Sequence, residues 1–437
     1  MMFRYYIWLA VRSLRRNPVL TGLMVVAIGL GIGASMTMLT LFRAMSGDPI
    51  PQKSAQLFVP QIDNWGPDQR EKDGEPPQPT LTYTDAEALM RAHAAPHQAA
   101  MYATGFSVTP ADPQQQPFKA DARATYADFF EMFDVPFQYG SGWGAAEDEA
   151  HNDVVVIDKK LNDKLFGGIN SVGKTVNLDN HDYRIVGVLK NWAPQPRVYD
   201  VMDDSFGDAE AVFLPFTVAI ERHMDIWGNN SCVKSTEPGW DGHLHSECVW
   251  IQFWAELPDA TQAQKYRSFL DNYAAEQQRS GRFHWAALTR LHNSREWMDL
   301  QHVVPKEASI LMVVSFGFLF VCLVNAVGLM LAKFMTRAAE TGVRRALGAN
   351  RRAIFMQCLV ETGVIGFAGG LLGLALTALG LIGVRAVLVK EMTYLTHLDL
   401  ADVVVAVLLA VAAAVLAGLY PTWRATQVQP AWQLKAN

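Results

Sequence analysis

Residues 333–352 read KFMTRAAETGVRRALGANRR and lie between two long apolar segments, so this stretch decides how the chain is organised. Six of its twenty residues are Lys or Arg, and only Glu340 is acidic. An excess of basic residues beside an apolar span marks the cytoplasmic side of a membrane. The stretch therefore predicts a cytoplasmic connection between two spans, with a short helical segment that a motor protein could contact.

Four runs are nearly free of charge and long enough to cross a bilayer, which takes about 20 apolar residues. They are residues 19–43, 309–332, 359–384 and 401–421. The 437-residue chain is nevertheless only 50% hydrophobic and carries 18% charged residues, because residues 44–308 are polar. The sequence thus predicts a membrane protein with four transmembrane α-helices and a large domain inserted between the first two.

The charges divide in the same way as the hydropathy. Residues 1–18 carry four arginines and no acid, and residues 333–358 carry a net charge of +5. Residues 44–308 carry −16, in a chain whose total is −6. By the positive-inside rule, both termini, including the tail 422–437, are expected in the cytoplasm of a multi-pass inner-membrane protein. The large domain and the short loop 385–400 are then expected in the periplasm.

The N-terminal segment has apolar residues at helical spacing and arginines on the other side, and Pro18 is expected to end it. It predicts a cytoplasmic helix that lies in the membrane interface, although a plain basic flank fits nearly as well. The apolar run that follows is longer than the 7–15 residues usual in a cleaved signal peptide, which favours an uncleaved anchor.

Glycines recur at close spacing in the first and third spans, where small residues let helix backbones approach in lipid. The first three spans carry no charged residue near their centres, which argues against an ion-coupled carrier or a proton pump. The glycines predicted to pack helices are Gly29, Gly33, Gly366, Gly369, Gly370 and Gly373.

Two of the four cysteines, Cys232 and Cys248, fall in the domain expected outside the cytoplasm, where an oxidising compartment favours a disulfide. The alternative is a Zn²⁺ site built from His243, His245 and Cys248. The disulfide is favoured, and no metal site is predicted, because the ligand spacing matches no common zinc pattern.

Residues 168–175, GINSVGKT, match the G-x-x-x-x-G-K-[ST] pattern of a phosphate-binding loop. That chemistry requires a strand before the loop and a helix after it. Here a predicted helix at 159–166 precedes the motif and a predicted strand at 175–178 follows it, so we interpret the motif as a turn. With no other catalytic pattern in the sequence, the chain is predicted to be a non-catalytic subunit.

Residues 340–349, ETGVRRALGA, resemble the E-I-G-x-x-R-A-x-G-A signature of FtsX-type permeases. The entry LRRNP ending at Pro18, the stretch 158–189 and the closing residues 420–430 are similar to MacB-like permeases. Together these segments cover nearly the whole chain. The sequence is therefore identified as resembling a MacB/FtsX-like permease of the type VII ABC transporter superfamily, without a fused ATPase domain.

This resemblance implies a Porter/Sabre-like α+β periplasmic domain, an FtsX-like core over residues 309–430, and pairing with a second permease, identical or paralogous. It also implies a separate cytoplasmic ATPase in two copies, which binds the ATP and Mg²⁺; no cofactor is expected in this chain. Such permeases transmit motion from the ATPase to the periplasmic domain. The alternative for the basic residues is that they obey the positive-inside rule or contact anionic lipid. The residues assigned to ATPase coupling are Arg337, Glu340, Gly342, Arg344, Arg345 and Gly348.

Three functions remain open at this stage. The favoured one is efflux of a periplasmic substrate, with a periplasmic adaptor and an outer-membrane channel as further partners. The alternatives are release of lipoproteins from the inner membrane and signalling that activates a periplasmic hydrolase. Nucleic acid is not an expected partner, and the substrate is left unassigned.

Overall fold

A computed structural model describes residues 2–70, 78–387 and 400–427. The chain forms two compact units. One combines Met1–Ser46 with Val304–Asn437, and the other is Gly47–Val303. The first unit is the helix bundle, and the second is the inserted domain that the polarity of the sequence predicts.

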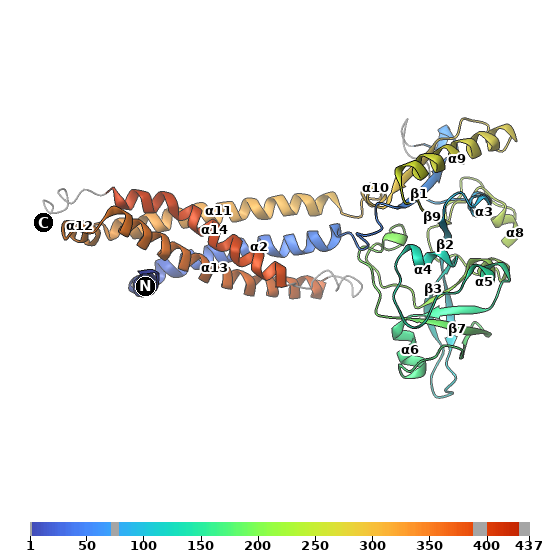
Figure 1. Ribbon diagram of the computed structural model, residues 1–437, viewed down its shortest axis with the longest axis horizontal. Helices are drawn as coiled ribbons and strands as arrows, with labels where there is room; N and C mark the ends of the chain where they lie inside the picture. Colours follow the sequence, from blue (N-terminus) through green and yellow to red (C-terminus); the bar gives the residue numbers. More distant parts are fainter. Residues whose placement is uncertain (1, 71–77, 388–399, 428–437) are drawn as a thin grey trace. The chain divides into compact units, whose positions relative to one another are not determined.

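Within the described residues, four helices of the bundle are long and apolar enough to span a membrane, namely α2, α11, α13 and α14. Figure 1 shows them running side by side. Each helix extends past the predicted span. Hydropathy marks only the apolar part of a helix, and the polar residues at its ends are helical as well. The bundle helices are α1 (Met2–Arg16), α2 (Pro18–Ser46), α11 (Lys306–Thr336), α12 (Ala338–Ala346), α13 (Arg351–Val387) and α14 (Leu400–Thr426).

The core of the bundle is organised by one face of α2. Met24, Ile28, Ile32 and Met36 recur every four residues and are completely buried. Residues four apart share a helix face, so this row contacts the neighbouring helices along much of the length of α2. Leu319 of α11 belongs to the same cluster.

Glycines let these helices approach closely. A Cβ at Gly33 would lie 2.8 Å from Leu376 Cβ, and one at Gly373 would lie 2.7 Å from a methyl carbon of Ile32. Any larger side chain would therefore push α2 and α13 apart. Equally close neighbours surround Gly29, Gly366, Gly369 and Gly370, so all six glycines predicted to pack helices lie at contacts between helices.

The connections between spans differ from the predicted boundaries. Residues 333–358, predicted as a cytoplasmic coupling loop with a short helical segment, are mostly helical, because α11 continues to Thr336 and α12 and the start of α13 follow. Helix α13 extends to Val387, into the loop predicted at 385–400, and residues 388–399 of that loop lie outside the described part of the chain. In the tail 422–437, α14 continues to Thr426, and residues 428–437 also lie outside it.

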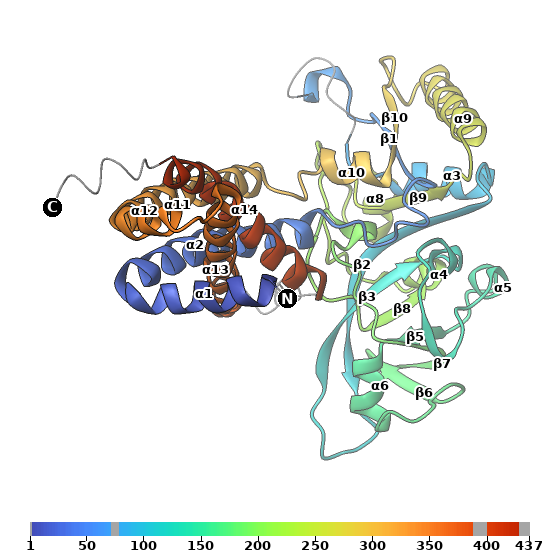
Figure 2. The same ribbon diagram turned by 60° about the vertical axis from the view of Figure 1, so that its left-hand side comes forward.

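The inserted domain is built on one mixed sheet with the strand order β10-β1-β9-β2-β3-β8-β5-β7-β4, and β6 pairs with both β2 and β7. Figure 2 shows β2 and β3 as long paired strands at its centre. Its elements are β1 (Leu57–Ile62), η1 (Pro67–Gln69), α3 (Tyr83–Ala92), β2 (His97–Thr109), β3 (Phe118–Thr125), α4 (Asp128–Met132), β4 (Phe137–Gly140), α5 (Ala145–Glu149), β5 (Val154–Ile157), α6 (Lys159–Phe166), β6 (Thr175–Leu178), β7 (His181–Leu189), η2 (Val198–Asp200), β8 (Val212–Pro215), α7 (Phe216–Glu221), α8 (Trp240–Leu244), β9 (Gln252–Glu256), α9 (Ala260–Arg279), β10 (Thr289–Asn293) and α10 (Ser294–Leu300).

Local sequence accounts for several of these boundaries. Asp179 and Asn180 both have positive φ, as a two-residue hairpin turn between β6 and β7 requires. Thr82 caps α3 by accepting a hydrogen bond from the Asp85 amide at 3.1 Å.

The phosphate-loop pattern sits in the context that the sequence indicated. It follows α6 and precedes β6, and Gly168 and Gly173 both have positive φ. The Gly173 amide donates to the Ile185 carbonyl, and the Lys174 ammonium lies 5.2 Å from the centre of the Phe166 ring. The motif is therefore a glycine-rich turn between a helix and a strand.

Cys232 and Cys248 are joined by a disulfide. One ring nitrogen of His243 and the two sulfur atoms all lie within 4.8 Å of one another. A sulfur atom committed to a disulfide does not act as a thiolate ligand, so this cluster is held by a covalent bond rather than by a metal.

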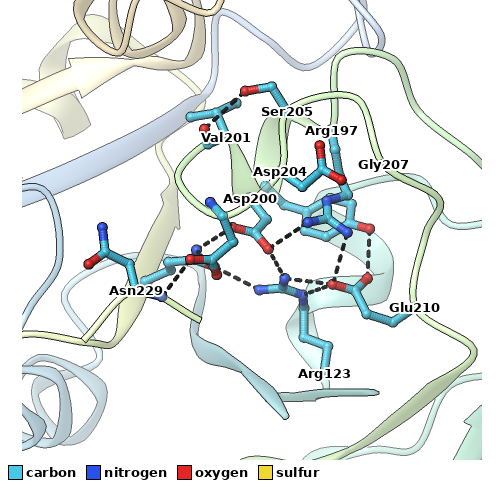
Figure 3. A network of polar contacts seen from close by, with 12 residues as sticks. Arg123, Arg197, Asp200, Val201, Asp204, Ser205, Gly207, Glu210 and Asn229 are labelled. Carbon is cyan, nitrogen blue, oxygen red and sulfur yellow. Dashed lines mark hydrogen bonds and ion pairs between the residues drawn. The ribbon is translucent and has the colours of Figure 1, made fainter. Parts of the chain in front are cut away.

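A network of buried charges secures the irregular segment between β7 and β8 (Figure 3). Arg123 of β3 is completely buried, and its guanidinium donates to Glu210 Oε1 at 2.7 Å and to Asp200. Arg197 also donates to Asp200, at 3.0 Å. Burial by itself would raise the pKa of Asp200 and of Glu210, but the two arginines hold both below their usual values.

Candidate functional site

The candidate site lies at the end of the bundle that carries α12. This helix follows α11 after a single non-helical residue, Arg337, and ends before Gly348. Gly348 has φ +99°, a left-handed conformation that glycine adopts without the steric cost a side chain would add. Gly342 is buried inside α12. The two glycines predicted for coupling thus occupy a buried position and a helix end.

Glu340 and Arg344 connect α12 to two other helices. They form an ion pair of 2.8 Å within α12, at the i,i+4 spacing that places side chains on one face. Glu340 also pairs with Arg16 of α1 at 3.3 Å. Arg344 donates to the side-chain oxygen of Gln357 in α13 at 3.1 Å.

Arg345 makes a third connection. Its guanidinium donates to the backbone carbonyl of Thr426, in the last turn of α14, at 3.4 Å. The predicted coupling residues are therefore not simply an array of free cations. Arg337, Arg344 and Arg345 all form contacts within the bundle, and these contacts join α12 to α1, α13 and α14.

The centre of the site is Glu361 of α13. The Lys333 ammonium lies 2.6 Å from its Oε1, and the Ser13 hydroxyl donates to the same oxygen at 2.5 Å. Arg337 lies 3.6 Å from that oxygen and also donates to the hydroxyl and carbonyl oxygens of Ser13. Lys333 is completely buried and Glu361 nearly so.

Glu361 and Lys333 were not among the residues predicted from sequence. A usable signal existed, because Glu361 is the one acidic residue in the span 359–384 and Lys333 is the first basic residue after the span 309–332. An ionisable residue in an apolar segment has a partner as a rule. Which cation pairs with Glu361 depends on how α11 packs against α13, and sequence spacing does not specify that.

These helices enclose a cavity of about 520 Å³. Its charged lining consists of four arginines and two glutamates, and its apolar lining includes Leu9, Phe334 and Ile354. The charged residues are Arg12, Arg16, Arg337, Glu340, Arg344 and Glu361. The excess of arginines over glutamates in this lining favours the binding of an anion.

Comparison with known proteins identifies this architecture. A family model described as the MacB-like periplasmic core domain matches residues 21–268, and one described as the FtsX-like permease C-terminal matches residues 312–430. The chain belongs to the MacB/FtsX-like permease family. The bundle is therefore the membrane part of an ABC transporter permease, and Gly47–Val303 is its periplasmic domain.

Two relatives are similar over part of their length. The macrolide export ATP-binding/permease protein MacB of Azoarcus sp. (strain BH72) is 25% identical over 428 residues, which are 96% of this chain and 58% of that protein. The pyoverdine export ATP-binding/permease protein PvdT of Pseudomonas aeruginosa is 26% identical over 255 residues, which are 57% of this chain and 33% of that protein. The chain thus spans less than two thirds of the length of these relatives.

Among solved structures, the periplasmic region of MacB from Actinobacillus actinomycetemcomitans aligns with a TM-score of 0.36 and 14% sequence identity. The alignment covers 57% of this chain and 94% of that structure.

Proposed function

We propose that this chain is a non-catalytic permease subunit that transmits motion from separate ATPase subunits to its periplasmic domain and thereby drives efflux. The observation that carries the proposal is the set of contacts around α12. Arg344 and Arg345 join this helix to α13 and α14, and Glu340 joins it to α1. A displacement of α12 would therefore be passed to the rest of the bundle.

The route to the periplasmic domain follows the covalent chain. Helix α2 leads directly into the domain that begins at Gly47, and α11 begins directly after that domain ends at Val303. Lys333, near the end of α11, is paired with Glu361 of α13. A change in the Glu361 ion pairs would thus shift α11 relative to α13, and the shift would reach the domain through a continuous helix.

The surface offered to the ATPase is the outer side of α12. Val343 is 55% exposed and Leu347 is 82% exposed, a large exposure for apolar side chains in a connection rich in charged residues. Aliphatic side chains at the centre of a docking site, surrounded by charged residues such as Glu340, are typical of protein interfaces. The ATPase, in two copies, would cover these two side chains and would bind the ATP and Mg²⁺.

Further partners follow from the exposed spans and from the relatives. Helix α11 leaves apolar residues such as Val313 and Phe320 exposed, and these would face lipid or a second permease, identical or paralogous. The names of the relatives describe macrolide export and pyoverdine export, which favours efflux over lipoprotein release or signalling. An adaptor and an outer-membrane channel would complete an efflux route. The N- and C-termini would face the cytoplasm.

The test is to isolate the full-length tagged chain from its own cells and weigh the intact complex by native mass spectrometry. We expect two permeases and two ATP-binding subunits in the wild-type complex. In a Leu347→Glu variant, the fraction of complexes that contain ATP-binding subunits should fall at least tenfold. The control is Ile169→Glu, an apolar residue in the other unit whose side chain is 56% exposed, which should retain them. A wild-type chain that carries no ATP-binding subunit would refute the proposal.

Co-purifying proteins distinguish the three functions. A periplasmic adaptor in the complex supports efflux, a lipoprotein-binding chaperone supports lipoprotein release, and a hydrolase supports signalling. Efflux is refuted if one of the latter two is found in stoichiometric amount and no adaptor is present.

A further inference from the structure

The cavity at the α12 end has a charge imbalance that the coupling contacts do not neutralise. Among the residues that the structure describes, four arginines and two glutamates line it, an excess of two positive charges. Its volume of about 520 Å³ falls within the usual range of small-molecule pockets, about 300 to 1,000 Å³. The lining therefore has both the size and the charge to bind an anionic group.

Two of these arginines are available for such a group. Within residues 2–70, 78–387 and 400–427, no carboxylate forms an ion pair with Arg12. Arg16 pairs with Glu340 at 3.3 Å, but its side chain remains 69% exposed. Both arginines belong to α1, one helical turn apart, so their guanidinium groups can converge on a single ligand.

The position of α1 indicates where the ligand comes from. Arg12 lies with its guanidinium carbon 5.4 Å from the centre of the Trp8 ring, and Trp8 is 55% exposed. Tryptophan and arginine on an amphipathic helix are typical of the lipid headgroup region. The spanning helices α11, α13 and α14 contribute to the cavity only through residues near their ends, which places the cavity at the same depth.

We propose that this cavity binds the headgroup of an anionic phospholipid from the inner leaflet. Arg12 and Arg16 pair with its phosphate, because guanidinium groups make strong, two-pronged hydrogen bonds to phosphate oxygens. Leu9, Phe334 and Ile354 supply apolar surface for the glycerol end of the lipid. The proposal shares with the proposed function only the orientation that places α12 in the cytoplasm.

A bound lipid would also connect two parts of the site. Arg16 shares Glu340 with Arg344, so a phosphate that attracts Arg16 competes with the contact between α1 and α12. Lipid binding and the arrangement of α12 are therefore linked through one carboxylate.

The test is native mass spectrometry of the full-length chain with added phosphatidylglycerol, phosphatidylcholine or inorganic phosphate. We expect one phosphatidylglycerol per chain, bound at least fivefold more tightly than phosphatidylcholine, and no competition by millimolar phosphate. R12Q should weaken the binding of phosphatidylglycerol about fivefold, as expected when one basic residue is lost at an anionic lipid surface. The matched control is R352Q, an exposed arginine of α13 that does not line the cavity, which should bind as the wild type does.

Each other outcome overturns the proposal. Equal losses in R12Q and R352Q would indicate unspecific charge attraction, and equal binding of phosphatidylcholine would show that the headgroup charge is not recognised. Effective competition by inorganic phosphate would assign the cavity to a soluble anion. If phosphatidylglycerol binds as expected while the wild-type chain carries no ATP-binding subunit, the lipid site stands and the proposed function alone fails.

Discussion

The two units of this protein each contain a buried cluster of charges, and the two clusters are built differently. In the periplasmic domain, Arg123 contacts Asp200 and Glu210 from the middle of a strand held by neighbours on both sides. In the bundle, Glu361 gathers Lys333 and Ser13 from separate helices beside a cavity. The first cluster joins a strand inside a sheet to one irregular segment, whereas the second joins three separate helices. We therefore expect the first network to stabilise its domain, and the second to rearrange only if the proposed function holds.

The largest expected loss of stability follows from replacing Arg123, the centre of the buried charge cluster in the periplasmic domain. Arg123→Met leaves two carboxylates buried without their main cation, which should lower the stability of the periplasmic domain by about 3 to 5 kcal/mol. Denaturant unfolding of the detergent-solubilised chain, followed by tryptophan fluorescence, measures it. Lys160→Met is the control, because its pair with Asp208 is exposed and is expected to contribute at most about 1 kcal/mol. Similar losses in both variants would contradict the special role of Arg123.

Asp148 is a buried carboxylate whose contribution to stability should change with pH in the opposite direction to that of Asp200 and Glu210. Burial raises the pKa of Asp148 to about 7, although the Ala127 amide and the Trp143 indole both donate to it. Because the folded pKa lies above the unfolded value, the unfolded state loses this proton first as pH rises. Stability should therefore fall between about pH 4 and pH 7, by up to about 4 kcal/mol for this group.

The measurement is the pH dependence of the unfolding midpoint in wild type and Asp148→Asn. The variant should lose the decline that belongs to this group, while Asp200 and Glu210, with lowered pKa values, still add stability as pH rises from acid. An identical slope in both proteins between pH 4 and pH 7 would show that Asp148 is ionised in the folded state.

The bundle cluster should show strong coupling but a smaller loss. Glu361→Gln and Lys333→Met each leave a partner uncompensated, and the double variant removes both charges together. We expect a coupling free energy of about 0.5 to 3 kcal/mol, with the double variant more stable than the sum of the single losses predicts. The stability of each variant is measured by heating it in detergent and recording the fraction of protein that stays monodisperse. Additive losses would show that the pair does not hold α11 to α13.

The variants that we expect to change stability least should have the largest effect on the stimulation of ATP hydrolysis. Glu340→Gln or Arg344→Gln removes the exposed pair within α12 together with one contact to α1 or α13, so stability should change by at most about 1 kcal/mol. ATP hydrolysis by the associated subunits should nevertheless lose its stimulation by the permease, with the complex still assembled. Retained stimulation in both variants would remove α12 from the transmission path.

Several features were predictable because they depend on neighbours in sequence. The four spans follow from the length of the apolar runs, and the β6–β7 hairpin follows from Asp179 and Asn180 between two alternating segments. The helix–turn–strand order around Gly173 likewise follows from local periodicity. Boundaries were less accurate, as the ends of the four spans show, because hydropathy does not distinguish a charged helix end from a loop.

The sequence by itself determined that this chain is a four-span membrane protein with a large polar insertion, since apolar length and the sign of flanking charges are properties of the linear chain. Only the tertiary structure decided which charges meet. Glu361 lies 348 residues from Ser13, and Arg123 lies 77 residues from Asp200, so each contact depends on how distant elements pack. The physical reason is that a hydropathy period specifies which face of a helix or strand is buried, but not which residue it faces.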